Sequence, residues 1–128
     1  MNQRTYVIPG RPFPLRRHRT RNGHSYDPPE NRLAKKWVQE HATEQGVEVF
    51  HKPTPVLLNL EFVYARPQKP KHQSPIGRPD IDNLVKLVLD ALNKIAWDDD
   101  AQVVDIAARK LYEDIADGCT RITIGVAT

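Results

Sequence analysis

Length, composition and charge set the first limits on this chain. It has 128 residues, of which 39% are hydrophobic and 27% charged, so we expect one soluble domain over residues 1–128. No apolar run is long enough to cross a membrane, and the N-terminus lacks the apolar core of a secretory signal, which predicts a cytoplasmic protein. The single cysteine excludes an internal disulfide.

The charges are unevenly distributed, although the formal net charge is only +3. Residues 1–36 hold nine Lys or Arg and two acids, and residues 66–78 hold four Lys or Arg and no acid. Residues 80–100 hold six Asp and two Lys. Because Lys and Arg bind phosphates and carboxylates bind hard cations, a basic surface around an acidic centre favours metal-dependent nuclease chemistry.

The N-terminal third combines a short strand with a basic, proline-rich segment. Residues 5–8 are predicted to form the strand. The prolines that follow exclude a long helix, and Asn22-Gly23 indicates a hairpin turn. We therefore place residues 16–19 and 24–26 on either side of that turn, as a basic ribbon or an ordered loop.

A helix is predicted next along the chain. Asp27 is its expected N-cap, Pro28 and Pro29 suit the first turn, and Gly46 is the expected stop. Its apolar face is predicted to comprise Leu33, Ala34, Trp37, Val38 and His41.

The rest of the chain alternates strands with one long helix. Residues 56–64 alternate apolar and polar side chains, which is the clearest strand pattern in the sequence. A polar, proline-rich loop over residues 66–79 leads into a helix over residues 80–95, and residues 103–112 and 119–126 are two further strands. This order predicts an α/β (α+β) fold, with a small mixed β-sheet and two main helices on one face.

The helix over residues 80–95 has a regular apolar stripe, which we expect to lie in the core. Leu87 and Leu89 flank this stripe and are expected to extend an apolar surface toward a partner. The stripe comprises Ile81, Leu84, Val85, Val88, Leu92 and Ile95.

Carboxylates gather at both ends of the same helix. Asp80 stands at its N-cap position and Asp82 in its first turn, where a structural role would explain either residue alone. Lys86 lies one turn after Asp82, and three consecutive Asp occupy residues 98–100. If these acids converge, carboxylates about 4 Å apart repel by roughly 4 kcal/mol per pair, a cost that a bound cation would remove. Oxygen ligands without cysteine suit Mg²⁺ or Mn²⁺ rather than zinc.

Residues 78–105, RPDIDNLVKLVLDALNKIAWDDDAQVVD, resemble the signature of the RusA-like Holliday junction resolvases. That signature reads D-x-D-N-L-x-K, then D-A-L, then D-D-x-Q-[VI]. The resemblance extends more loosely to the N-terminal strand, the Arg-rich segment and the helix that begins with proline. The matching residues are Asp80, Asp82, Asn83, Leu84, Lys86, Asp90, Ala91, Leu92, Asp99, Asp100, Gln102 and Val103.

The resemblance implies a homodimer of mixed α/β fold that binds four-way DNA junctions and nicks two strands with Mg²⁺ during recombination and repair, with Mn²⁺ as an expected substitute. It implies that Asp80, Asp82 and Asp100 hold the metal, that Asp99 contributes to the site, and that Lys86 is a catalytic helper. Asp98 lies outside the core motif. Relatives of this short, Arg-rich type often occur in phages and prophages, so a bacterial or phage-infected cell is the expected setting.

Cations that bracket the acidic motif are the candidates for contacts with DNA phosphates. Two other interpretations remain. A branched-DNA or RNA-binding module without catalysis would explain the cations but not the acids. A nuclease of the PD-(D/E)xK type is disfavoured because no Asp or Glu after residue 80 is followed two positions later by Lys. The candidates are Arg16, Arg17, Arg19, Lys69, Lys71 and Arg78, with Asn83 of the motif placed beside them.

Overall fold

The computed structural model describes residues 3–128, so Met1 and Asn2 of the expected 1–128 domain lie outside the described residues. Its strands and helices follow the predicted order along the chain. They are β1 (Arg4–Pro9), β2 (Arg19–Arg21), β3 (His24–Tyr26), α1 (Pro29–Glu44), β4 (Val56–Ala65), α2 (Ile81–Leu92), the short 3-10 helix η1 (Asp100–Gln102), β5 (Val103–Glu113) and β6 (Gly118–Val126).

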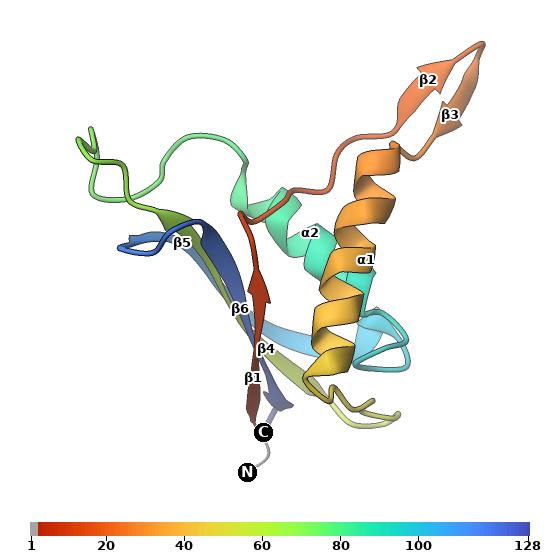
Figure 1. Cartoon of the computed structure of the whole chain (residues 1–128). Coiled ribbons are helices and arrows are strands. Elements are labelled where there is room, and N and C mark those ends of the chain that lie inside the picture. Colours follow the sequence, from red (N-terminus) through yellow and green to blue (C-terminus); the bar gives the residue numbers. More distant parts are fainter. Residues whose placement is uncertain (1–2) are drawn as a thin grey trace.

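Four strands form the main sheet, in the order β1-β6-β4-β5. β4 and β5 are parallel, whereas β6 is antiparallel to both of its neighbours. α1 and α2 pack on the same side of this sheet, and the separate β2-β3 ribbon projects beyond the start of α1 (Figure 1). The structure confirms the predicted mixed sheet with two helices on one face.

β4 is the central element of the core. Its alternation places Leu58, Leu60 and Phe62 on the helix-covered face, where each is almost fully buried. Ile122 of β6 pairs with Leu60 and is equally buried. The residues between them face the other side of the sheet, which no helix covers, and there Arg121 donates to Glu61 at 2.8 Å. The alternating pattern therefore predicted the correct inward face.

α1 differs from its prediction in both its cap and its buried face. Pro28 occupies the N-cap position, and the Asp27 side chain instead accepts a hydrogen bond of 2.7 Å from Asn31. Leu33 is 69% exposed and Trp37 is 48% exposed, so neither lies fully in the core. The reason is that α1 lies at the margin of a narrow sheet; its fully buried positions are Asn31, Val38 and Ala42.

α2 ends at Leu92 rather than at the predicted residue 95. Lys94 adopts a positive φ of 70°, and its amide donates to the Trp97 carbonyl at 2.8 Å, so the chain turns back just after the helix. The expectation that Leu87 faces a partner is wrong, because Leu87 is only 2% exposed and packs in the core between the two helices and the sheet. Within residues 3–128, neither helix has the length and apolar character needed to cross a bilayer.

Candidate functional site

The start of α2 presents two free carboxylates, Asp80 and Asp82. Asp80 occupies the N-cap position, but its side chain makes no capping hydrogen bond. Asp82 is exposed, and Lys86 lies 3.9 Å from it, one turn along the helix. Both carboxylates line a shallow hollow of about 530 Å³ beside Lys110, which we call the edge hollow. The two acids therefore face one solvent-filled space and keep nearly all of their oxygen lone pairs available.

Lys110 of β5 holds the chain in place just before this pair. Its ammonium donates to the carbonyls of Gly77 at 2.8 Å and Pro79 at 2.9 Å. The end of the long loop is thereby fixed against the sheet where Asp80 begins α2. Sequence reasoning missed Lys110, although a signal existed: it interrupts an otherwise apolar or aromatic alternation of Ile106, Ala108 and Tyr112 on the inward face of β5.

A basic arm, residues 11–21, is tied to both helices beside Asp80. The Leu15 amide donates to the Asn83 carbonyl in the first turn of α2, at 2.9 Å. Asn31, fully buried in α1, accepts from the Arg16 amide at 2.8 Å and donates to the Arg16 carbonyl at 2.9 Å. These hydrogen bonds to the backbone of the arm explain how a stretch with little regular structure keeps a defined position.

The arm and α2 together form a groove of about 800 Å³. One wall comes from the arm, and the other from the residues that lead into α2. Four of the predicted DNA contacts and one predicted metal ligand therefore meet at this groove. They are Arg16, Arg17, Arg78 and Asn83, together with Asp80.

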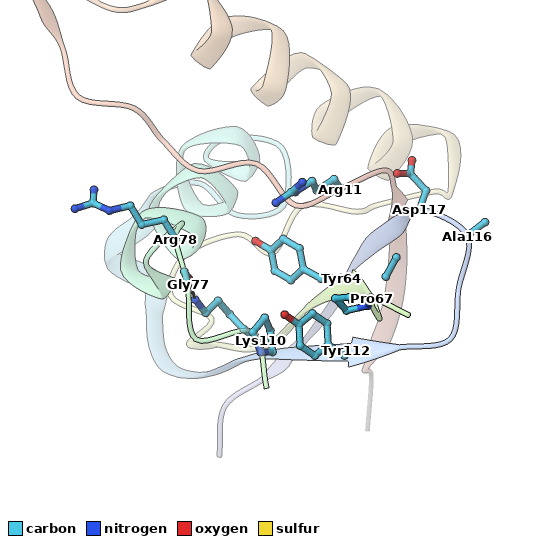
Figure 2. Close-up of a pocket in the computed structure, with 11 residues that line it drawn as sticks. Arg11, Tyr64, Pro67, Gly77, Arg78, Lys110, Tyr112, Ala116 and Asp117 are labelled. Carbon is cyan, nitrogen blue, oxygen red and sulfur yellow. Dashed lines mark hydrogen bonds between the residues drawn. The ribbon is translucent and has the colours of Figure 1, made fainter. Parts of the chain in front are cut away.

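Another hollow, of about 380 Å³, shares Arg11 and Arg78 with this groove. Figure 2 shows the Tyr64 ring in its middle, with Arg11 above it and Lys110 below. The Arg11 guanidinium lies 5.6 Å from the centre of that ring. The Tyr64 hydroxyl is buried without a hydrogen-bond partner in the described residues, and burial raises the pKa of this phenol. The lining of this hollow holds three cations and one acid, Asp117, and of the cations only Arg11 has a contact with the Tyr64 ring, because Lys110 donates to two backbone carbonyls.

Three predicted DNA contacts lie away from this centre. Arg19 sits in the β2-β3 ribbon, where its guanidinium donates to Glu30 at 2.7 Å. Lys71 lines a different hollow with Arg66 and Tyr112, and Lys69 is exposed near the tip of the same loop. The structure therefore separates the cations beside Asp80 from those at the periphery.

At the other end of α2, all three Asp of residues 98–100 are engaged. Asp98 accepts from the Lys52 amide at 2.9 Å and contacts the His51 ring at 3.0 Å, and these two contacts lower the pKa of its carboxyl. Asp99 and Gln102 form a reciprocal capping box at η1. Asp100 accepts a hydrogen bond of 2.8 Å from the indole N–H of the buried Trp97, which leaves its second oxygen free.

The two acidic groups are far apart within one chain. α2 has 12 residues, which corresponds to about 18 Å along its axis, and the groups flank its two ends. In residues 3–128, no three acids, histidines or cysteines lie close enough together to hold a metal ion. The structure brings Asp80 and Asp82 together, but it does not bring Asp100 of the same chain to them.

The chemistry of the acidic pair fits Mg²⁺. Asp80 and Asp82 offer only carboxylate oxygens, both are exposed to water, and neither side chain has a hydrogen bond that would compete for the metal in the described residues. A hard cation that retains several waters could be held by two such groups and completed by a third carboxylate. Asp100, with its free oxygen, is suited to be that third group, with Asp99 next to it.

Comparisons with known proteins point to the same family as the acidic motif of residues 78–105. A family model described as endodeoxyribonuclease RusA matches residues 9–126. The uncharacterized protein YqaN of Bacillus subtilis (strain 168) is 33% identical over 122 residues, which cover 84% of this chain and 82% of that protein. The crossover junction endodeoxyribonuclease rusA of Lactococcus phage r1t is 38% identical over 69 residues, 52% of this chain and 53% of that protein. The resemblance seen in residues 78–105 is confirmed: the chain belongs to the endodeoxyribonuclease RusA family.

Proposed function

We propose that the protein is a Mg²⁺-dependent, structure-specific DNA endonuclease that resolves four-way junctions by paired nicking during recombination and repair, in the cytoplasm of a bacterial or phage-infected cell. The observation that carries the proposal is the free Asp80 and Asp82 pair beside an arginine-lined groove. Carboxylates left unneutralised next to a phosphate-binding surface repel DNA unless a cation bridges the two. The name of the phage relative supports the same activity.

The distance between the two acidic groups supports a homodimer. Because α2, about 18 Å long, separates the acidic pair from the turn that carries Asp100 in the same chain, and no three such groups gather in residues 3–128, a three-carboxylate site requires two chains. We therefore assign Asp80 and Asp82 of one protomer and the partner's Asp100, with the partner's Asp99 as a contributor, to each metal site. A two-fold dimer then has two sites, one for each strand that must be cut.

Each side chain of the proposed site has a defined task. The metal, when bound, would lower the pKa of a water and stabilise the leaving oxygen, and Mn²⁺ would serve in its place. Lys86 neutralises charge that builds on the phosphate, since its ammonium already lies beside Asp82. Arg16, Arg17 and Arg78 hold backbone phosphates along the groove, and Asn83 helps to position the strand there. Arg19, Lys69 and Lys71 contact the outer arms of a large branched substrate.

Cleavage of a synthetic four-way junction, run beside a linear duplex of the same sequence, tests this proposal. We expect paired nicks in the junction with Mg²⁺ or Mn²⁺, none with a chelator, and little cutting of the duplex. Asp80→Asn should abolish nicking while junction binding in gel shift persists. Tight junction binding without metal-dependent cutting under any of these conditions would show a branched-DNA-binding module instead.

A further inference from the structure

The hollow of about 380 Å³ around Tyr64, here called the Tyr64 hollow, adjoins both parts of the proposed site. It shares Arg11 and Arg78 with the arginine-lined groove. It shares Lys110 with the edge hollow, where the acidic pair lies. Its volume is within the range of pockets that hold small ligands. A DNA strand that follows the groove to the acidic pair would therefore pass next to the Tyr64 hollow.

Two tyrosines on neighbouring strands give the hollow an aromatic wall. Tyr64 of β4 is paired with Tyr112 of β5, near the carboxyl ends of these two parallel strands. Pro67 and Pro75 add apolar rings from the loop that follows β4, and Figure 2 shows Tyr112 below Tyr64 with Pro67 beside them. Flat rings in a largely apolar surrounding suit another flat ring, such as a nucleobase, which stacks on aromatic side chains.

The Tyr64 hydroxyl is a polar group in need of a partner. The residue is only 8% exposed, and within residues 3–128 nothing forms a hydrogen bond with its hydroxyl. A buried hydroxyl without a partner costs free energy, so a ligand atom that bonds to it binds favourably. The Arg11 guanidinium lies over the ring, 5.6 Å from its centre, and none of the ion pairs within residues 3–128 includes it. This exposed side chain can therefore move to admit a ligand to the ring.

The charges around the hollow favour a neutral ligand over a phosphate. Lys110 donates to two backbone carbonyls, so its ammonium is already engaged. Asp117 also lines the hollow, and its carboxylate would repel a phosphate, whereas it can accept a hydrogen bond from the amino group of a base. The other two cations of the lining, Arg11 and Arg78, also line the groove, where the backbone phosphates are placed.

The backbone that frames the hollow is held by contacts between distant parts of the chain. The Gly10 amide donates to the Gly118 carbonyl at 3.1 Å, which fixes the backbone of Arg11 beside the turn between β5 and β6. Gly118 has a φ of 147°, and a Cβ there would lie 3.2 Å from the Arg11 Cα, so this close approach depends on glycine. Lys110 fixes Gly77 on the opposite side. A frame that is formed in advance reduces the entropy lost on binding.

We propose that the Tyr64 hollow receives one unpaired nucleobase of the DNA strand that lies in the groove. This inference rests on the proposed function and deepens it, since it assigns a pocket that distinguishes branched DNA from duplex. The base stacks on the Tyr64 ring where the Arg11 guanidinium now lies, forms a hydrogen bond with the Tyr64 hydroxyl, and is covered on its outer face by that guanidinium. Removing a base from a duplex breaks stacking and pairing, whereas a base left unpaired at a branch point enters at lower cost.

A four-way junction that lacks one base in each strand tests the pocket. A tetrahydrofuran nucleotide, which keeps its phosphate but has no base, is placed at successive positions from the crossover. Fluorescence anisotropy with a chelator present gives the affinity while no strand is cut. For the parent protein, we expect one position at which loss of the base weakens binding about tenfold.

Tyr64→Phe shows whether that base lies against Tyr64. The variant keeps the ring and loses the hydroxyl, so it should bind the intact junction about fivefold more weakly. It should bind the junction that lacks the critical base as well as the parent does, because the hydrogen bond is already absent there. Binding to a linear duplex should not change, since all of its bases are paired.

Tyr6→Phe is the matched control. Tyr6 is also a buried tyrosine with an arginine over its ring, Arg4 at 5.1 Å, but it lines neither the Tyr64 hollow nor the groove. This variant should bind every DNA as the parent does. Tyr64→Phe removes only a hydroxyl that lacks a partner in the described structure, so it should fold like the parent, which circular dichroism checks.

Three results would overturn the pocket: base-free positions that never weaken binding, a Tyr64→Phe variant that binds the intact junction like the parent, or equal weakening of the intact and the base-free junction. The last result would indicate a phosphate in the hollow. The proposed function is tested separately, by junction cleavage with the parent protein. A parent that cuts junctions but gives any of these results keeps the function and loses the pocket. Base-dependent binding through Tyr64 without cutting would do the opposite.

Discussion

The two ends of α2 carry similar numbers of carboxylates but treat them in opposite ways. At the start of the helix, the side chains of Asp80 and Asp82 are exposed and lack hydrogen bonds in the described structure, apart from the 3.9 Å contact of Asp82 with Lys86. At its end, Asp98 accepts a hydrogen bond from the Lys52 amide, Asp99 forms a capping box with Gln102, and Asp100 accepts a hydrogen bond from the Trp97 indole. The comparison shows that acids at the end of α2 stabilise local structure, with one oxygen of Asp100 left over, whereas the pair at its start has no such partners and is fully available to a ligand.

The largest effect is expected in a complementation experiment, which measures junction cleavage by two single variants and by their mixture. Asp80→Asn and Asp100→Asn should each abolish junction cleavage as single variants, because each breaks both sites of its dimer. In a mixture, every heterodimer contains one intact site, formed by Asp80 of one chain and Asp100 of the other. We expect about a quarter of the parent's nicking activity for freely exchanging chains, as single nicks rather than paired cuts. If all ligands came from one chain, mixing would restore nothing.

Stability measurements separate the roles of the two ends. Asp100→Ala should lower the free energy of unfolding by about 1–3 kcal/mol, because the buried Trp97 indole N–H loses its acceptor. Asp80→Ala should change it by less than about 0.5 kcal/mol. Asp100→Asn keeps an acceptor oxygen, so it should lose cleavage while retaining stability and junction binding. Urea denaturation of the three variants checks these values, and equal losses at the two ends would contradict the comparison.

Cations near the start of α2 should contribute more to DNA binding than cations near its end. Replacing Arg16 and Arg17 together by Ala should weaken junction binding and reduce the slope of log affinity against log salt by about 2. Residual cleavage should remain at high protein concentration. The matched control replaces Lys52 and Lys94, which are engaged by Asp99 and by the Asp98 carbonyl, and should change the slope less. An unchanged slope in the Arg16 and Arg17 variant would remove the arm from the DNA surface.

The smallest expected effect concerns Asp27, a carboxylate that accepts a hydrogen bond as the acids at the end of α2 do. The Asn31 amide that donates to it, followed by nearby cations including Lys35, lowers the pKa of Asp27 below its usual 3.8. Its ionised form therefore stabilises the fold above about that pH, and this contribution is lost as the pH falls through the depressed pKa. The difference in Tm between the parent and Asp27→Ala should be present at pH 7 and vanish in stronger acid. Asp114→Ala, on an exposed side chain, should show little difference at either pH.

Much of the fold and of the site followed from local pattern alone. The alternation in residues 56–64 predicted the inward face of β4, because side chains in a strand alternate between its two faces. The spacing of Asp80, Asp82 and Lys86 placed three candidate residues on one helix end, since the α-helical repeat is the same in any protein. The motif in residues 78–105 was specific enough to indicate the family.

Tertiary structure decided what local pattern could not. Leu33 and Leu87 are equally apolar in the sequence, but the narrow sheet and the crossing of the two helices leave the first exposed and bury the second. The distance from Asp80 to Asp100 depends on α2 lying straight between them, and the hold of Lys110 on the chain before Asp80 depends on a strand that comes later in the sequence. Contacts between distant parts of a chain depend on how its layers pack, and a periodic pattern carries no information about that packing.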